Sequence, residues 1–198
     1  MEGKNFNPDE VFIVVSSGRG KDKAHEDKAH GQTLKNILSA SGKYTAALWT
    51  TADYTHNEPQ LSSTQKVIFI GENDVSKRNF ASIEWKFEAP NMKYGWIGSV
   101  AVLTVGNTLL SELEWKDFIQ MFTTQTVTIK SGKFKGGIAA AAAAVLFGVG
   151  LWWLSLPIPI IVGVVRNKKL ARQRKGQYDY LIRQFVLNDI DSFLENKT

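Results

Sequence analysis

The sequence VFIVVSSG, residues 11–18, begins with five apolar and mostly β-branched residues and ends in a turn signal. An unbroken apolar run of this length is typical of a strand buried on both faces, as in sheets with helices on either side. The next segment, residues 24–40, places Leu34, Ile37 and Leu38 on one helical stripe. A buried strand followed by an amphipathic helix predicts an α/β fold.

Four more strands are predicted before residue 106. They are residues 44–51, 66–70, 84–88 and 96–105. Pro90, Asn91 and Gly95 supply the turn between the last two, which could pair antiparallel. A capping box at 111–114 then starts a further helix. The sequence therefore predicts an α/β domain over residues 1–129, with a small mixed sheet and flanking helices.

The composition excludes several classes of protein. The chain has no cysteine, which rules out a disulfide scaffold, and its 43% hydrophobic and 22% charged residues are far from the composition of a disordered chain. The net charge of +5 is unevenly distributed. Residues 1–129 carry 13 Lys and Arg against 15 Asp and Glu, whereas residues 130–198 carry 11 against 4. The basic character therefore belongs to the C-terminal third.

Thirty consecutive residues, 136–165, carry no charge: GGIAAAAAAVLFGVGLWWLSLPIPIIVGVV. About 20 apolar residues span a bilayer, and the strongly apolar residues here would contribute roughly −7 kcal/mol to insertion. A buried core helix of a soluble protein is the alternative, but a chain of 198 residues has little interior for so long a segment. We therefore predict a membrane-inserting region over 130–175, with 136–165 as its apolar part.

Both flanks of this apolar segment are basic, and residues 130–175 contain no acid. The positive-inside rule favours the cytoplasmic side for both flanks, which implies a hairpin bent near Pro157 and Pro159. A single crossing is the alternative. The length of the segment does not decide between the two, because thirty residues are too many for one straight span and too few for two. The basic residues expected at the membrane surface are Lys130, Lys133, Lys135, Arg166, Lys168, Lys169, Arg172, Arg174 and Lys175.

Small residues recur at every fourth position of the apolar segment, at Gly136, Ala140, Ala144 and Gly148. In lipid, such a stripe lets two helix backbones approach closely, so it predicts self-association into a homo-oligomer. A merely alanine-rich anchor is the alternative.

The last predicted element, residues 176–198, is an amphipathic helix. Its apolar residues recur at spacings of three and four and define one face. They are Tyr178, Leu181, Ile182, Phe185, Val186, Ile190, Phe193 and Leu194. This face either packs on the α/β domain, lies in the membrane interface or pairs with a second copy.

The candidate ligand site is the turn after the first strand. It consists of Gly18, Arg19, Gly20 and Lys21. Ligands bind at strand carboxyl ends in α/β sheets, and glycines with cationic side chains suit an anion or a phosphate. Glu72 and Asp74, after the third strand, could face the same crevice and hold a ribose, a base or Mg²⁺. Neither the dinucleotide-binding nor the Walker A pattern is complete, and an exposed basic loop is the alternative.

Nothing in the sequence requires a metal, a known cofactor or an enzyme mechanism. His25 and His30 are five residues apart, so they point about 140° apart on a helix and cannot form a zincin pair. Both are expected at the surface. His56 is expected in a polar loop with Asp53 and Glu58, and no G-x-S-x-G motif is present. Anionic lipid accounts for the basic C-terminal region without nucleic acid.

Together these features predict a membrane protein whose N-terminal domain lies in the cytoplasm, because the acidic, polar start does not resemble a secretory signal. Its predicted role is that of an effector that senses a ligand or partner, such as a nucleotide or another anion. The α/β domain would couple this ligand to membrane anchoring, oligomerisation or permeabilisation, as in pore-forming proteins. A membrane-anchored enzyme acting on a nucleotide or other phosphate ester is the alternative.

Overall fold

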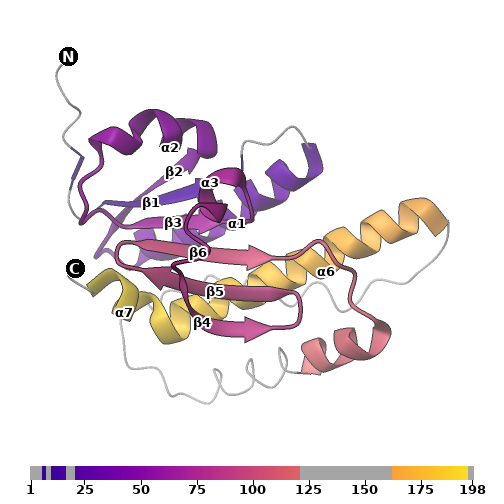
Figure 1. Cartoon of the computed structure of the whole chain (residues 1–198). Coiled ribbons are helices and arrows are strands. Elements are labelled where there is room, and N and C mark those ends of the chain that lie inside the picture. The colour runs from indigo at the N-terminus through magenta and orange to yellow at the C-terminus, as the bar shows by residue number, and fades with distance from the viewer. Residues whose placement is uncertain (1–5, 8–9, 17–20, 121–161, 196–198) are drawn as a thin grey trace.

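The computed structural model describes residues 6–7, 10–16, 21–120 and 162–195. They form one six-stranded sheet with helices on both of its faces (Figure 1). The strands are β1 (Glu10–Val15), β2 (Thr45–Thr50), β3 (Val67–Ile70), β4 (Glu84–Ala89), β5 (Met92–Ile97) and β6 (Val100–Val105). The helices are α1 (Lys21–Ala40), α2 (Thr51–Asn57), η1 (Glu58–Gln60), α3 (Asp74–Lys77), a helix over 112–120, α6 (Val162–Gln184), the π-helix η3 (Phe185–Asp189) and α7 (Ile190–Glu195). The predicted α/β class is confirmed.

The strands are ordered β2-β1-β3-β6-β5-β4 across the sheet. The first four in this order are parallel, whereas β5 is antiparallel to β6 and β4 is antiparallel to β5. Because β2 and β3 lie on opposite sides of β1, the connections through α1 and α2 cover opposite faces of the sheet. The carboxyl ends of β1 and β3 therefore form a topological switch point, where open α/β sheets bind ligands.

The core lies on both faces of the sheet, and β1 is buried between them as predicted. Val11, Ile13 and Val15 contact the layer of α1 and α6, whereas Phe12 and Val14 contact the layer of α2 and α3. The three residues of the predicted α1 stripe, Leu34, Ile37 and Leu38, are fully buried. The pattern of the sequence therefore correctly identified a strand buried on both faces and the inward face of α1.

The structure has three strands where the sequence predicted two. Residues 96–105, expected as one strand, are divided into β5 and β6 by a turn at Gly98, whose φ of 54° suits glycine. Pro90 and Asn91 form the predicted turn between β4 and β5, with Asn91 at φ 65°. Gly95 is not a turn residue, because it lies within β5, where a Cβ would come within 2.2 Å of a carbonyl oxygen of β4. The β-branched residues on both sides of the Gly-Ser turn concealed it.

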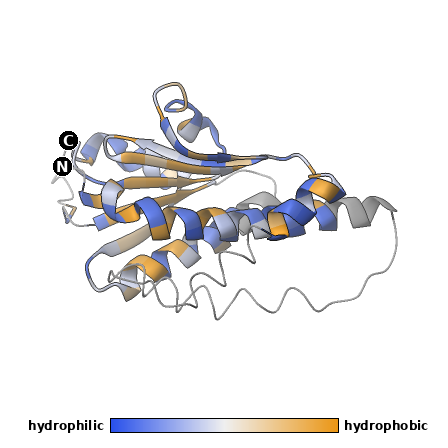
Figure 2. Cartoon of the chain, turned by 90° about the horizontal axis from the view of Figure 1, so that it is seen from below, coloured by the Kyte–Doolittle hydropathy of each residue, from blue (hydrophilic) through white to orange (hydrophobic). Residues whose placement is uncertain are grey.

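The C-terminal helices α6, η3 and α7 pack on the same face of the sheet as α1 (Figures 1 and 2). All eight apolar residues that the sequence placed on one face are buried, the most accessible being Leu194 at 8%. The hydroxyl of Tyr94 in β5 also donates to the Asp189 carboxylate in η3 at 2.5 Å. Packing on the α/β domain, one of three predicted placements of this face, is therefore confirmed.

The helix α6 begins at Val162, so the basic residues from 166 to 175 and the amphipathic part after 175 belong to one helix. The prediction from the sequence divided them at residue 175.

The predicted membrane-inserting region lies mostly outside the described residues. Only its last part, from residue 162, is described, as the start of α6. In the ranges that the structure does describe, no helix is long and apolar enough to cross a membrane. Lys130, Lys133, Lys135 and the small-residue stripe Gly136, Ala140, Ala144 and Gly148 fall in the undescribed range. Insertion and self-association therefore stay predictions.

A buried histidine joins α1 to α6. His30 was expected at the surface, but it is 2% exposed and its ring stacks on Tyr178, with the ring centroids 4.7 Å apart. That expectation is wrong because α6 covers this side of α1. His30 Nδ1 lies 3.5 Å from Asp179 Oδ1, and Lys175 Nζ donates to Asp179 Oδ2 at 3.2 Å. Burial by itself would raise the pKa of the Asp179 carboxyl, but His30 and Lys175 hold it below its usual value.

The lowered pKa of Asp179 predicts a pH-dependent contribution to stability. It is complete above the unfolded-state pKa of about 4 and is lost as the pH falls through the lower folded-state pKa. Near neutral pH, Asp179→Asn should lower the free energy of unfolding by about 2 kcal/mol. Urea denaturation should show this difference from the wild type shrinking below about pH 4.

The matched control for this substitution is Glu195→Gln, which removes the exposed partner of Lys43. Solvent screening makes such surface pairs weak, so stability should change little. Equal losses in the two variants, or a loss for Asp179→Asn that grows on acidification, would contradict the assignment.

Candidate functional site

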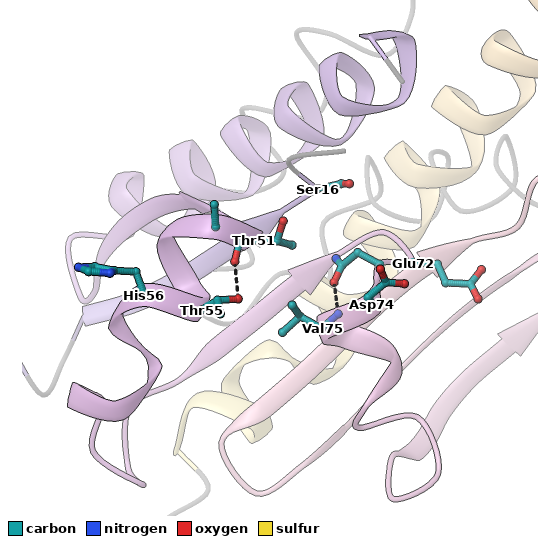
Figure 3. A pocket seen from close by; sticks show the side chains of 9 residues that line it. Ser16, Thr51, Thr55, His56, Glu72, Asp74 and Val75 are labelled. Carbon is teal, nitrogen blue, oxygen red and sulfur yellow. Dashed lines mark hydrogen bonds between the residues drawn. The ribbon is translucent and has the colours of Figure 1, made fainter. Parts of the chain in front are cut away.

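The topological switch point carries an open depression of about 790 Å³ (Figure 3). Three parallel strands contribute to it at their carboxyl ends. Ser16 directly follows β1, α2 begins where β2 ends, and α3 follows β3. The lining residues are Ser16, Thr51, Ala52, Thr55, His56, Glu72, Asn73, Asp74 and Val75. We call this depression the switch-point pocket.

A capping box determines where α2 begins. The Asp53 N–H donates to Thr50 Oγ1 at 3.2 Å, and the Thr50 N–H donates to Asp53 Oδ2 at 2.8 Å. The two hydrogen bonds that the Asp53 carboxylate accepts, from the Thr50 N–H and the Thr50 hydroxyl, hold the pKa of this carboxyl below its usual value. The polar loop expected around His56 is therefore a helix, which brings His56 to the pocket. The Thr-x-x-Asp spacing of the capping box was the signal that could have revealed it.

A second capping box determines the start of α3. Asn73 Oδ1 accepts from the N–H groups of Val75 and Ser76 at 3.0 and 2.8 Å, and the Asn73 N–H donates to Ser76 Oγ at 3.0 Å. These N–H groups already have acceptors, as does that of Asp53 in α2. They are therefore poorly suited to bind a phosphate. Asn73 Nδ2 is buried and has no hydrogen-bond partner among the described residues, so the pocket offers it as a donor.

The polar side chains of the switch-point pocket are three hydroxyls, two carboxylates, the Asn73 amide and the His56 imidazole. Glu72 and Asp74, predicted to face one crevice, both line it, and Glu72 and His56 lie at its opposite ends (Figure 3). Lys77 Nζ lies 3.5 Å from Glu72 Oε1, on the exposed rim. No Lys or Arg is among the described residues that line the pocket. These groups can form hydrogen bonds with the hydroxyl groups of a sugar.

The other predicted ligand residues lie on the chain that leaves β1. Gly18, Arg19 and Gly20 fall outside the described residues, and Lys21 is the first residue of α1. No cluster of three or more His, Asp or Glu that could hold a metal ion occurs in the described part of the chain. Sequence reasoning missed Thr51 and Thr55, because a short helix after β2 was not expected.

A buried carboxylate lies beside the pocket on the other face of the sheet. Asp27 of α1 is 4% exposed, and a Cβ on Gly71 would come within 2.7 Å of Asp27 Oδ2. Gly71 also has a φ of 91°, which favours glycine. Both the close approach of Asp27 and the positive φ therefore require glycine at position 71. Through Asp27, α1 contacts the chain directly before Glu72.

Polar side chains attach α6 to the loops at the carboxyl end of β6. The Leu110 N–H donates to Gln173 Oε1 at 2.9 Å, and Gln173 Nε2 donates to the Leu110 carbonyl at 3.4 Å. Asn91 Nδ2 donates to Gln177 Oε1 at 3.1 Å, and the Arg174 guanidinium donates to Asn107 Oδ1. We call these residues the α6 attachment: Asn91, Asn107, Leu110, Gln173, Arg174 and Gln177.

The predicted membrane-surface residues of α6 have different environments. Arg174 is 5% exposed within the α6 attachment, and Lys175 pairs with Asp179. Lys168 and Arg172 are exposed, and Lys169 is half-buried. Arg166 belongs to the first turns of α6. The charges of Lys168 and Arg172 are therefore the most accessible of those with described side chains.

Comparisons with protein-family models, curated proteins and solved structures found no match to this chain.

Proposed function

We propose that this chain is a membrane-associated ligand-sensing protein. Its α/β domain lies in the cytoplasm, receives a ligand in the switch-point pocket and holds both ends of an apolar hairpin. The observation that carries the proposal is the α6 attachment, because it joins residues that precede the apolar segment to residues that follow it. Ligand binding would then act on the membrane segment through the domain from which it emerges.

The attachment of both ends favours a hairpin over a single crossing. A single crossing would place residues after 165 on the far side of the membrane, and the core would lose the apolar face of α6, η3 and α7. Burying one such side chain contributes about 1.5–3 kcal/mol, so losing eight would cost on the order of 10 kcal/mol or more. That is comparable to the entire stability of a typical domain. An inserted segment would therefore enter and leave the bilayer on the same side.

The charge on α6 supports contact between this helix and anionic lipid. Lys168 and Arg172 are exposed and lie a few residues after the apolar segment. Each basic residue near an anionic surface contributes about 1 kcal/mol to binding. The small-residue stripe would bring copies of the hairpin together, and assembly or permeabilisation of the membrane by a homo-oligomer is the proposed outcome.

The position and chemistry of the switch-point pocket support ligand sensing. Ser16, Glu72 and Asp74 converge from two adjacent parallel strands, at the place where open α/β sheets bind ligands. The carboxylates can accept hydrogen bonds from the ribose hydroxyls of a nucleotide. The N–H groups of Asp53, Val75 and Ser76, in the first turns of α2 and α3, already have acceptors, which favours a sensor over an enzyme that acts on phosphate groups at these helices.

The hairpin predicts that both flanks of the apolar segment are accessible from one side of the membrane. The chain has no cysteine, so single cysteines at the exposed positions Glu112 and Lys168 can be labelled selectively. In sealed vesicles with the α/β domain outside, a membrane-impermeant maleimide should label both equally, and detergent should add no further labelling. Alkaline carbonate should leave the protein in the membrane. Labelling of Lys168→Cys that appears only after detergent would establish a single crossing and overturn the hairpin.

The pocket predicts binding of nucleosides and nucleotides that depends on its carboxylates. Calorimetry with adenosine and AMP should show binding that Glu72→Gln with Asp74→Asn weakens about tenfold or more, because hydrogen bonds to charged acceptors are lost. Glu88→Gln, an exposed carboxylate on β4, is the matched control and should leave affinity unchanged. The site would be contradicted if neither adenosine nor AMP bound. It would also be contradicted if Glu88→Gln weakened binding as much as Glu72→Gln with Asp74→Asn.

A further inference from the structure

One end of the sheet collects the pocket, the loop after β6 and the part of α6 that contacts this loop. The parallel strands β1, β3 and β6 have their carboxyl ends on this side, where the switch-point pocket lies. Leu110 follows β6 at the same end, and the helix over 112–120 begins directly after it. The β5–β6 turn at Gly98 lies at the opposite end, since it precedes β6. We call these the carboxyl end and the amino end of the sheet.

The helix α6 extends past the carboxyl end (Figures 1 and 2). Gln173 is bonded to Leu110 at this end, and α6 begins eleven residues earlier, at Val162. At 1.5 Å per residue, this part of the helix adds about 16 Å beyond the α6 attachment. It carries the exposed side chains of Lys168 and Arg172 and leads directly from the apolar segment.

We infer that the carboxyl end is the surface that faces the membrane, with α6 contacting anionic lipid headgroups. This inference rests on the proposed function, because the apolar segment must insert for the orientation to exist. Since the chain enters α6 from that segment, the start of α6 lies nearest to the bilayer. The switch-point pocket then opens on the membrane-facing side, and its ligand is bound close to the lipid surface.

The acidic residues at this end determine how it approaches an anionic surface. Glu72 and Asp74 line the pocket, and Glu112 and Glu114 lie on the helix over 112–120, with all four exposed. Anionic headgroups repel these carboxylates and attract the basic end of α6. In this orientation the basic start of α6 makes the closest contact with the headgroups, and the pocket lies farther from them.

This orientation predicts an order of distances from the membrane. Lys168 on α6 is nearest, Leu113 at the carboxyl end is intermediate, and Ile97 at the amino end is farthest. The latter two are the exposed large hydrophobic side chains among the described residues, at 70% and 45%, so a label at either site disturbs little packing. The β6 strand alone separates the two ends by about 17 Å.

The test uses the full chain with a single cysteine at position 168, 113 or 97, labelled with a donor fluorophore. Each variant is reconstituted into phosphatidylcholine vesicles containing phosphatidylglycerol and a headgroup-linked acceptor, with acceptor-free vesicles as the control. Energy transfer should decrease in the order Lys168→Cys, Leu113→Cys, Ile97→Cys. Equal transfer at positions 113 and 97, or stronger transfer at 97, would overturn the orientation while leaving insertion intact. Failure of all three variants to float with the vesicles would overturn the proposed function together with this inference.

Discussion

The side chain of Gln173 holds the backbone of Leu110 through both its N–H and its carbonyl, and the arrangement of the C-terminal half of the chain depends on this contact. It joins a loop that leaves the sheet to a helix that returns to it 63 residues later. Gln173 is 2% exposed, so these hydrogen bonds are made away from water, where a lost partner costs about 1–3 kcal/mol. The contact therefore sets where α6 crosses the sheet.

The polar attachment and the apolar packing of the C-terminal helices have different effects. The apolar face of α6, η3 and α7 supplies most of the free energy that holds these helices on the sheet, because its side chains complete the core over β5 and β6. Apolar packing by itself tolerates shifts in register, whereas hydrogen bonds to one loop do not. The α6 attachment and the His30–Asp179 contact thus specify the position of a helix that the core stabilises. This position places the start of α6 at the same end as the switch-point pocket.

Much of the fold was predictable because its signals are local. The run Val11 to Val15 identified a strand buried on both faces, and the spacing of Leu34, Ile37 and Leu38 identified the inward face of α1. The spacing from Tyr178 to Leu194 likewise identified a face that the core now contains. The positions of Glu72 and Asp74 followed from their place after a buried strand, since parallel strands end at one edge of the sheet.

The features that were not predicted depend on distant partners or on short elements. His30 is buried because α6 covers it, and no pattern near residue 30 indicates this neighbour. Gln173 and Gln177 resemble exposed polar residues in the sequence, but their partners lie more than 60 residues away. The turn at Gly98 lies within an apolar run, and α2 spans only two turns. Local periodicity cannot detect such features.

The central claim is that the chain after the apolar segment belongs to the same folded domain as the chain before it. Cleavage within the intervening residues tests this directly. A protease site inserted between Ser131 and Gly132 of the N-terminally tagged, membrane-reconstituted protein allows a cut, after which the membrane is dissolved in mild detergent. The account predicts that the C-terminal fragment remains bound to the tagged fragment under native conditions and separates only in denaturant. Release of the C-terminal fragment in mild detergent would contradict it.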